Sequence, residues 1–246
     1  ATLASSTPGV VILNGTSTYP DLAIAASGSN LTPFVFGLDA SAPCGATLSF
    51  TLTVAYTGGT SPKTFAFTMR CGSPGAPVTF SYAGAAVPIP DGTGLTGTTP
   101  GALTPVPLAV SGVTGGIWDL DLRIDGATCS NASGSTTVGI DHSYVNDLQI
   151  SLQSPAGTTL MAIENTDGGG NNFCQTLLDD ESGGPSIQSV VSADAPFTGS
   201  YTPNAALAAF DGETANGTWN LLAQDFYAGD TGNVRAFSLV ITPAIC

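Results

Sequence analysis

The sequence predicts an all-β protein made of two β-sandwich domains, and three observations support this. Apolar residues never recur at helical spacing for three turns, and Gly or Pro interrupts nearly every window of about fifteen residues. Segments that alternate apolar and polar residues recur at short intervals, each bounded by Gly, Pro, Asn or Ser. The 31 glycines and 17 prolines accompany long β-branched and aromatic runs, which excludes a disordered chain.

Charge and hydropathy narrow the possible partners. The 246 residues include 18 acidic and 4 basic side chains, for a net charge of −14. Nucleic acids and anionic membranes need clustered Lys and Arg, so neither is an expected partner. No run approaches the roughly 18 apolar residues of a membrane span. We therefore expect a secreted, extracellular monomer. Because it starts without Met inside a predicted strand, we expect a mature product or part of a longer secreted protein.

The first domain is predicted at residues 1–85 as an immunoglobulin-like sandwich. Alternating segments lie at 9–15, 32–38, 46–56 and 63–70. Within 46–56, every second residue is apolar and the residues between are mostly Ser and Thr, so one face is apolar. The residues between the third and fourth segments have the length of a hairpin loop. Pro and Gly then gather, and we place a linker near 73–87.

The second domain is predicted at residues 86–246. Its strand-like segments lie at 108–112, 116–125, 136–155, 157–165, 218–226 and 234–242. The last two segments predict a closing hairpin. The tract from 165 to 205 is long, irregular and rich in Gly, Asn and Asp. Such a loop in a compact domain is usually functional and often organised by a metal.

The five cysteines have no metal-ligand spacing, so we expect disulfides. Pairing within each predicted domain gives Cys44–Cys71 and Cys129–Cys174, although four cysteines allow three pairings. Cys246 is left over as a free thiol, an interchain partner or a cysteine whose partner lies outside this sequence. No cysteine has a basic neighbour that would make it a catalytic thiolate.

No catalytic or organic-cofactor site is expected. His142 is the single imidazole, no G-x-S-x-G elbow occurs, and we predict a structural histidine bonded to a nearby carboxylate or carbonyl. Candidate carboxylate pairs for glycoside hydrolysis, among Asp179, Asp180 and Asp225, lie in loops with Gly and Asn rather than in an aromatic cleft. Both tryptophans sit in apolar strand-like segments, so we expect them in the core.

Calcium is the stronger expectation. Ca²⁺ takes six to eight oxygen ligands gathered by flexible loops, and the acidic, amide-rich stretch 164–182 supplies them. Asp179 and Asp180 repel each other unless a cation or donor neutralises them. The predicted ligands are Asp147, Asp167, Asn172, Asp179 and Asp180. No EF-hand pattern fixes the set. The alternative is a solvated acidic loop whose aspartates cap turns.

Two further acidic groups are interpreted chiefly without a metal. Asp225 and Asp230 flank a Gly-containing turn, and we expect Asp230 to cap it, with a metal site as the alternative. Asp119, Asp121 and Asp125 alternate along one strand, which predicts a single outward, solvated face.

The second domain resembles the P domain, or Homo B domain, which follows the catalytic domain of proprotein convertases and of many bacterial secreted proteases. The resemblance covers about 89–242 and rests on these segments: IPDG at 89–92, HSYVNDLQISLQSPAGT at 142–158, NNFCQTLLDDES at 171–182, APFTGSYTPNAALAAFDGE at 195–213 and NGTWNLLAQDFYAGDTGNVRAFSLVI at 216–241. Asn146 stands where a Gly commonly precedes the DL pair, and 125–137 has the character of an insertion. The first block resembles the CARDB-like or immunoglobulin-like repeats that often precede P domains.

The resemblance implies a jelly-roll-like sandwich with no chemistry of its own. It implies a C-terminal segment of a secreted endopeptidase, either serine (subtilisin-type) or metal-dependent, and we take the subtilisin serine type as the first expectation. Its partner would be the catalytic domain of the parent protein, which it stabilises and whose calcium and pH dependence it shifts. The alternative is a carbohydrate-binding or cell-surface adhesion module, for which Tyr144, Phe226 and Tyr227 are the scattered aromatic candidates.

Overall fold

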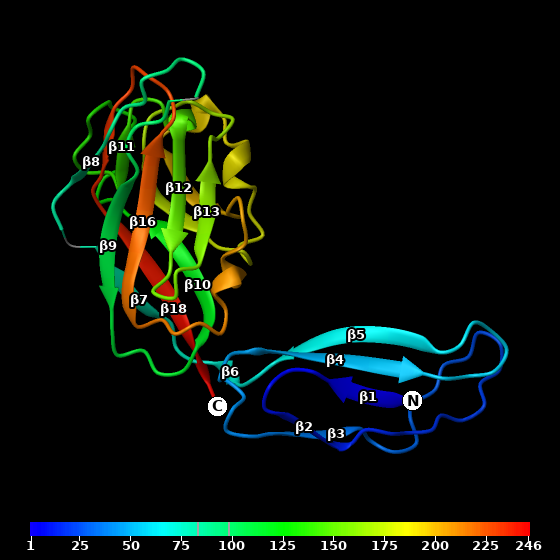
Figure 1. Ribbon diagram of the computed structural model, residues 1–246. Helices are drawn as coiled ribbons and strands as arrows, with labels where there is room; N and C mark the ends of the chain where they lie inside the picture. Colours follow the sequence, from blue (N-terminus) through cyan, green and yellow to red (C-terminus); the bar gives the residue numbers. More distant parts are fainter. Residues whose placement is uncertain (83, 98) are drawn as a thin grey trace.

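The computed structural model describes residues 1–82, 84–97 and 99–246 and confirms the all-β prediction (Figure 1). The helical elements of these residues are single turns of 3-10 helix: η1 Val145–Asp147, η2 Ile187–Ser189, η3 Ser192–Asp194 and η4 Leu207–Phe210. Figure 1 shows an upright sandwich, from whose foot a second, elongated unit extends sideways and carries the N-terminus.

The N-terminal unit packs a three-stranded sheet against a two-stranded ribbon. The sheet has the order β1-β4-β5 and the ribbon is β2-β3. Their bounds are β1 Thr2–Ser5, β2 Val10–Asn14, β3 Val35–Leu38, β4 Thr47–Val54 and β5 Lys63–Arg70. Phe50 of β4 is buried between Phe36 of β3, at a ring-centroid distance of 4.8 Å, and Phe67 of β5, at 5.4 Å. The immunoglobulin-like assignment of this unit stays a prediction.

Two sheets form the C-terminal unit, both antiparallel except for the parallel pair β14–β15 in the larger one. The smaller has the order β13-β12-β16-β9, and the larger has the order β6-β18-β10-β14-β11-β17-β8, with β15 beside β14 and β7 beside β18. The bounds are β6 Ser73–Pro74, β7 Val78–Ser81, β8 Val87–Ile89, β9 Thr104–Val110, β10 Ile117–Ile124, β11 Ile140–His142, β12 Leu148–Gln153, β13 Thr159–Glu164, β14 Phe173–Leu178, β15 Phe197–Tyr201, β16 Gly217–Asp225, β17 Gly232–Val234 and β18 Phe237–Ile245.

The core between these sheets follows the alternation of the sequence. Alternate residues of β12, and of β16 from Trp219 onward, are buried, as expected for strands with one face inward. Trp219 is fully buried, donates from Nε1 to the Ala215 carbonyl at 2.8 Å and meets Phe210 edge-on at 5.2 Å. Pro105 and Pro107 are tolerated in β9 because it is an edge strand. Trp118 is only half-buried, so the core prediction holds for Trp219 alone.

The segment 73–87, predicted as a linker, instead contains paired strands. β6 pairs with the end of β18, and β7 pairs with its middle. Pro and Gly interrupt the alternation of this segment in the sequence. Its strands form because the backbone of β18 offers antiparallel pairing to both β6 and β7. The boundary between residues 85 and 86 stays a prediction, although β7 belongs to the larger C-terminal sheet.

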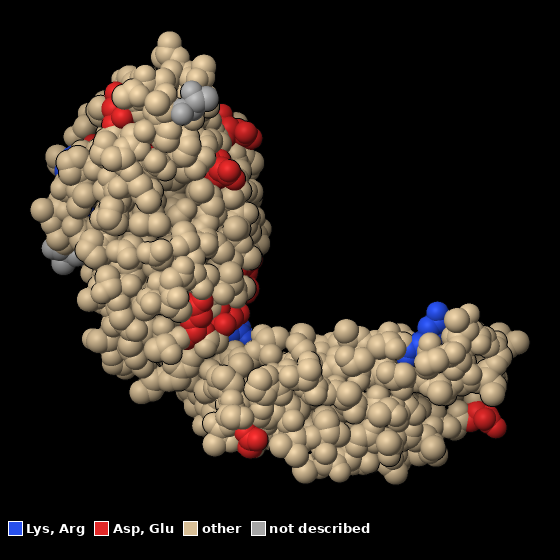
Figure 2. Space-filling view, in the orientation of Figure 1, with Lys and Arg blue, Asp and Glu red and all other residues tan. Residues whose placement is uncertain are grey.

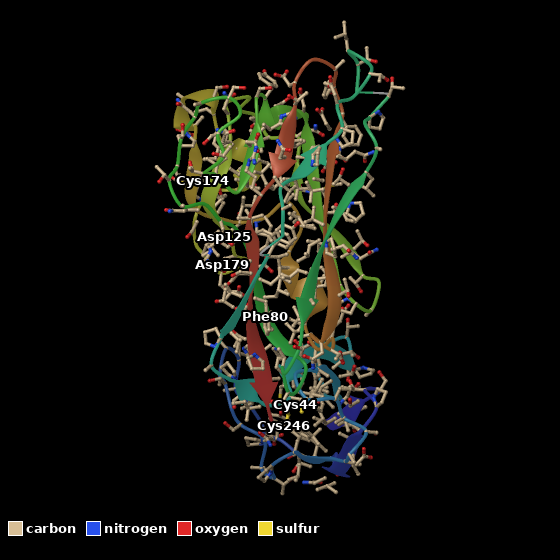
Figure 3. The ribbon with its side chains drawn as sticks, turned by 90° about the vertical axis from the view of Figure 1, so that its left-hand side faces the viewer. Cys44, Phe80, Asp125, Cys174, Asp179 and Cys246 are labelled. Atoms are coloured by element: carbon tan, nitrogen blue, oxygen red, sulfur yellow. A yellow bond between two sulfur atoms is a disulfide. The ribbon has the colours of Figure 1, made fainter. Side chains whose placement is uncertain are left out.

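One disulfide prediction is correct and one is wrong. Cys129 and Cys174 are bonded, as expected. Cys44 is bonded to Cys246, with 5.9 Å between the Cα atoms, and Cys71 is a free, buried thiol. Figure 3 shows Cys44 and Cys246 together at the foot of the sandwich. Pairing within domains fails because β18 carries the last residue of the sequence back to the N-terminal unit.

Candidate functional site

Two groups of titratable side chains, most of them buried or half-buried, are candidates for a functional site. The first, the His142 cluster, comprises His142, Asp147, Asp225, Asp230 and Asp91. The second, the junction pocket, lies where the N-terminal unit meets β10. No helix in the described parts of the chain has the length and apolar character of a membrane span.

His142 is held by hydrogen bonds at both ring nitrogens. It ends β11 and is 1% exposed. Its Nδ1 lies 2.9 Å from the Tyr144 carbonyl oxygen, and its Nε2 lies 3.1 Å from Oδ2 of the fully buried Asp225. The backbone N–H of His142 donates to Oδ1 of Asn172 at 3.1 Å. The partners of the ring nitrogens are a backbone group and a carboxylate, so among the described residues neither nitrogen contacts a hydroxyl or thiol that it could activate. These contacts agree with the predicted structural role.

Asp147 lies next to this pair and is poorly compensated. It is 5% exposed, and its carboxylate accepts no hydrogen bond from the described residues. Its backbone is fixed, because its N–H donates to the Tyr144 carbonyl at 3.1 Å and its carbonyl accepts the Phe226 N–H at 2.9 Å. Burial, and then the charges of Asp225 and Asp230, raise the pKa of Asp147 to about 6.

Turns around Asp225 complete the cluster. Oδ1 of Asp225 accepts the Tyr227 N–H at 3.0 Å, so this aspartate joins the end of β16 to the following turn. Asp230 accepts the Ser143 hydroxyl at 2.7 Å. Both carboxylate oxygens of Asp91 accept the Gly229 N–H, at 3.1 Å and 3.2 Å. Asp230 therefore bonds to a residue next to His142, a contact that the turn interpretation did not include.

The five predicted calcium ligands do not share one site. Asp147 belongs to the His142 cluster, and Asn172 contacts this cluster because its Oδ1 accepts the His142 N–H. Asp167 is exposed, and its N–H donates to the Gln188 carbonyl. Asn172 is buried and uses its side-chain N–H groups on the carbonyls of Ser130 and Ala132, which ties the insertion 125–137 to β14.

Asp179 and Asp180 lie in the turn after β14 and act as caps. Asp179 Oδ1 accepts the Glu181 N–H at 2.7 Å. Asp180 accepts the N–H groups of Leu207 and Ala208, at 3.0 Å and 2.8 Å, at the start of η4. Backbone donors thus supply part of the neutralisation for which the sequence suggested a cation.

The junction pocket is a hollow of about 350 Å³ between the two units. Its lining comprises Arg70, Pro74, Trp118, Asp119, Asp121, Asp179, Glu181 and Thr242. Acidic atoms and one blue basic group meet at this corner in Figure 2. Asp119 and Asp121 are therefore not on a freely solvated face, because the turn after β14 and the end of β5 enclose them.

The charged form of Asp121 is disfavoured in this pocket. Burial, followed by the charge of Asp119, raises the pKa of Asp121 to about 7. Oδ1 of Asp121 is buried and has no hydrogen-bond partner among the described residues. Asp125, the third residue of the alternating set, is by contrast satisfied, since it accepts Nε of Arg123 and the Ser238 hydroxyl, each at 2.5 Å.

Arg70 is the cation at this junction. Its Nη1 lies 3.1 Å from Oδ2 of Asp211, its Nη2 donates to the Ile117 carbonyl at 3.3 Å, and its guanidinium lies 4.2 Å from the ring centroid of Trp118. Burial raises the pKa of Asp211 to about 6 even though Arg70 lowers it. One side chain of β5 thus contacts three groups of the C-terminal unit.

Asp121→Asn is expected to stabilise the protein at pH 8. A carboxyl whose pKa is raised by folding from 3.8 to about 7 contributes its full stability below pH 4, and that contribution is lost as the pH rises through 7. After allowance for solvent screening, neutralising it should add about 1–2 kcal/mol at pH 8 and little at pH 4. Thermal unfolding at both pH values measures this.

Asp39→Asn is the matched control for Asp121→Asn. Asp39 is exposed, and the Ser41 hydroxyl and backbone N–H lower the pKa of its carboxyl, so its neutralisation should give no gain at pH 8. An Asp121→Asn midpoint at pH 8 equal to or below that of the unsubstituted protein would contradict the assignment.

The three aromatic residues considered for glycan binding differ in solvent exposure. Tyr144 is 45% exposed, whereas Phe226 and Tyr227 are half-buried. The ring pairs formed by described residues include none of these three.

A comparison with protein families bears directly on the C-terminal unit. Residues 133–241 match the family model of the proprotein convertase P-domain. The match spans β11 to Ile241 in β18 and includes every member of the His142 cluster except Asp91. The P-domain is a non-catalytic accessory domain of proteases, which agrees with the engaged imidazole of His142.

The chain is also similar to leupeptin-inactivating enzyme 1 of Streptomyces exfoliatus. The two are 28% identical over an alignment of 165 residues, which covers 63% of this chain and 28% of that enzyme. The similarity therefore spans little more than a quarter of the relative's length. No solved structure matches the chain. The P-domain match, the relative and the disulfides together indicate a protease-associated, extracellular protein.

Proposed function

We propose that this chain is the non-catalytic accessory segment of a secreted endopeptidase of the subtilisin serine type, which stabilises and regulates the catalytic domain. The P-domain match over residues 133–241 carries the proposal. The His142 geometry supports it, because the one imidazole of the sequence is used to fasten β11 to β16. The relative, named for inactivating leupeptin, supports a parent that acts on peptides. The subtilisin type rests on the sequence resemblance.

Removing the segment from its parent enzyme tests the stabilising role. A parent that lacks residues 1–246 should lose activity faster on heating, while its remaining active molecules should turn over substrate at a similar rate. This separation follows because an accessory domain adds native-state contacts and supplies no reacting group.

Calcium binding belongs to the same proposal, with the His142 cluster as the site. Asp147 fits a cation ligand, since its buried carboxylate lies beside Asp225 and Asp230 and accepts no described hydrogen bond. Among the described residues, however, no three His, Cys, Asp or Glu side chains are grouped to hold a metal. Backbone carbonyls, amide oxygens or water would therefore supply most of the ligands, and the ion would offset the repulsion at Asp147.

Ca²⁺ is expected to raise the thermal unfolding midpoint of the chain. A ligand that binds only the native state at one hundred times its dissociation constant adds about 2.7 kcal/mol. Unfolding is measured in excess EDTA and again in millimolar Ca²⁺. Asp147→Asn should abolish the shift, whereas Asp167→Asn should keep it, because Asp167 is exposed outside the cluster. Superimposed curves for the unsubstituted protein would contradict calcium binding.

A further inference from the structure

Three of the five cysteines meet at the foot of β18. Cys44 and Cys246 form the disulfide that joins the last residue of the sequence to the N-terminal unit. The thiol of Cys71 lies 3.8 Å from Sγ of Cys246, which is van der Waals contact. Residues 44, 71 and 246 come from a loop, the end of the β5 region and the end of β18, so the tertiary fold alone brings the sulfurs together.

Backbone contacts fix the positions of the three sulfurs. The Gly45 N–H donates to the Cys71 carbonyl, and the Cys71 N–H donates to the Ala46 carbonyl, both at 2.9 Å. Gly72 has φ +95°, and a Cβ there would lie 2.5 Å from the Ile245 carbonyl oxygen and 2.9 Å from Sγ of Cys246. Glycine at 72 therefore permits both the left-handed backbone and the approach of Cys246 to Cys71.

We propose that these three cysteines form an internal thiol–disulfide exchange site. The Cys71 thiol loses its proton, and its sulfur attacks Sγ of Cys246. The Cys71–Cys246 bond forms while the Cys44–Cys246 bond breaks. Cys44 leaves as a thiolate and takes up the proton. One thiol and one disulfide are present before and after the step, so no oxidant or reductant is consumed.

The exchange moves the thiol without releasing the tether. Cys71 is 6% exposed, whereas Cys44 is half-buried, so the second isomer carries its thiol on the more exposed of the two residues. Both isomers join Cys246 to the N-terminal unit, because Cys44 and Cys71 both belong to that unit. The site thus combines a permanent covalent link between the units with a thiol that small electrophiles or disulfides can modify at Cys44.

Alkylation of the native full chain tests the proposal. The protein is held at pH 8, where thiolate forms, and quenched at pH 4, where exchange stops. It is then denatured and labelled briefly with N-ethylmaleimide at pH 6.5, and unreduced peptides are mapped by mass spectrometry. The ratio of label on Cys44 to label on Cys71 should rise with time at pH 8 and reach a plateau. Cys129–Cys174 is the internal control, which should stay unlabelled.

Variants distinguish exchange from a fixed pairing. Cys44→Ser should form the Cys71–Cys246 bond, and Cys71→Ser should keep Cys44–Cys246 and take up no label. Label confined to Cys71 at every time would overturn the proposal, as would a Cys44–Cys71 bond with label on Cys246. The time course on the unsubstituted chain decides the matter if a serine variant fails to fold.

Discussion

Replacing His142 with alanine is expected to lower the free energy of unfolding by about 3–5 kcal/mol, because Asp225 is left buried without its partner. Both side chains are 0% exposed, so water cannot replace the lost contact without opening the domain. Urea denaturation followed by tryptophan fluorescence at pH 7 measures the change. Trp219 reports on this core, since it lies on the same strand, β16, and on the same buried face as Asp225.

Ser143→Ala is the matched control for His142→Ala. It removes a half-buried hydroxyl that donates to Asp230 at 2.7 Å and accepts the Thr231 N–H at 3.2 Å, and it leaves the His142–Asp225 pair intact. The free energy of unfolding should fall by about 1–2 kcal/mol, the net value of two hydrogen bonds. If His142→Ala lowers the free energy of unfolding no more than Ser143→Ala does, the His142–Asp225 contact does not stabilise the packing of β11 against β16.

Arg70→Ala is expected to destabilise the junction by about 2–3 kcal/mol at pH 8. The variant loses the ion pair with Asp211, the bond to the Ile117 carbonyl and the contact with Trp118. The figure is reduced for solvent screening, because the side chains of Arg70 and Asp211 are 27% and 19% exposed. Thermal unfolding at pH 5 and pH 8 measures the effect.

The pH dependence of the Arg70→Ala effect has a definite sign. The folded pKa of Asp211 is about 6, so at pH 5 much of this carboxyl is already protonated and the ion pair contributes less. The loss should therefore be smaller at pH 5 than at pH 8. Lys63→Ala, at the other end of β5, is the control, since Lys63 forms no ion pair with the described residues. Equal losses in the two variants would contradict a specific junction contact.

The strands and the P-domain segment could be predicted from the sequence because both depend on local pattern. Alternation predicted β4, β5, β10, β12 and β18, and turn residues bounded them. The His142 cluster brings together residues that are distant in the sequence, so most of it could not be predicted. The burial of Asp225 could have been. Asp225 falls in phase with Trp219, Leu221 and Ala223, which face the core, so its register already predicts a buried carboxylate.

Other features had no signal in the sequence. Asp119 and Asp121 do face outward from β10, as alternation predicts, but the turn after β14 and Arg70 cover that face. The Cys44–Cys246 bond required knowing that β18 returns to the N-terminal unit, and no local pattern encodes that return. β5 alternates apolar and polar residues, yet its apolar residues Phe65, Phe67 and Met69 are 55%, 42% and 47% exposed.

The half-life of the parent enzyme's activity on heating tests the central claim most directly. The intact parent is compared with a form that lacks residues 1–246 and with one that carries His142→Ala, using the same peptide substrate. We expect a much shorter half-life without the segment, an intermediate one for His142→Ala, and similar initial turnover in all three. Equal half-lives would contradict the stabilising role, and turnover abolished by His142→Ala in a folded enzyme would show that this histidine is catalytic.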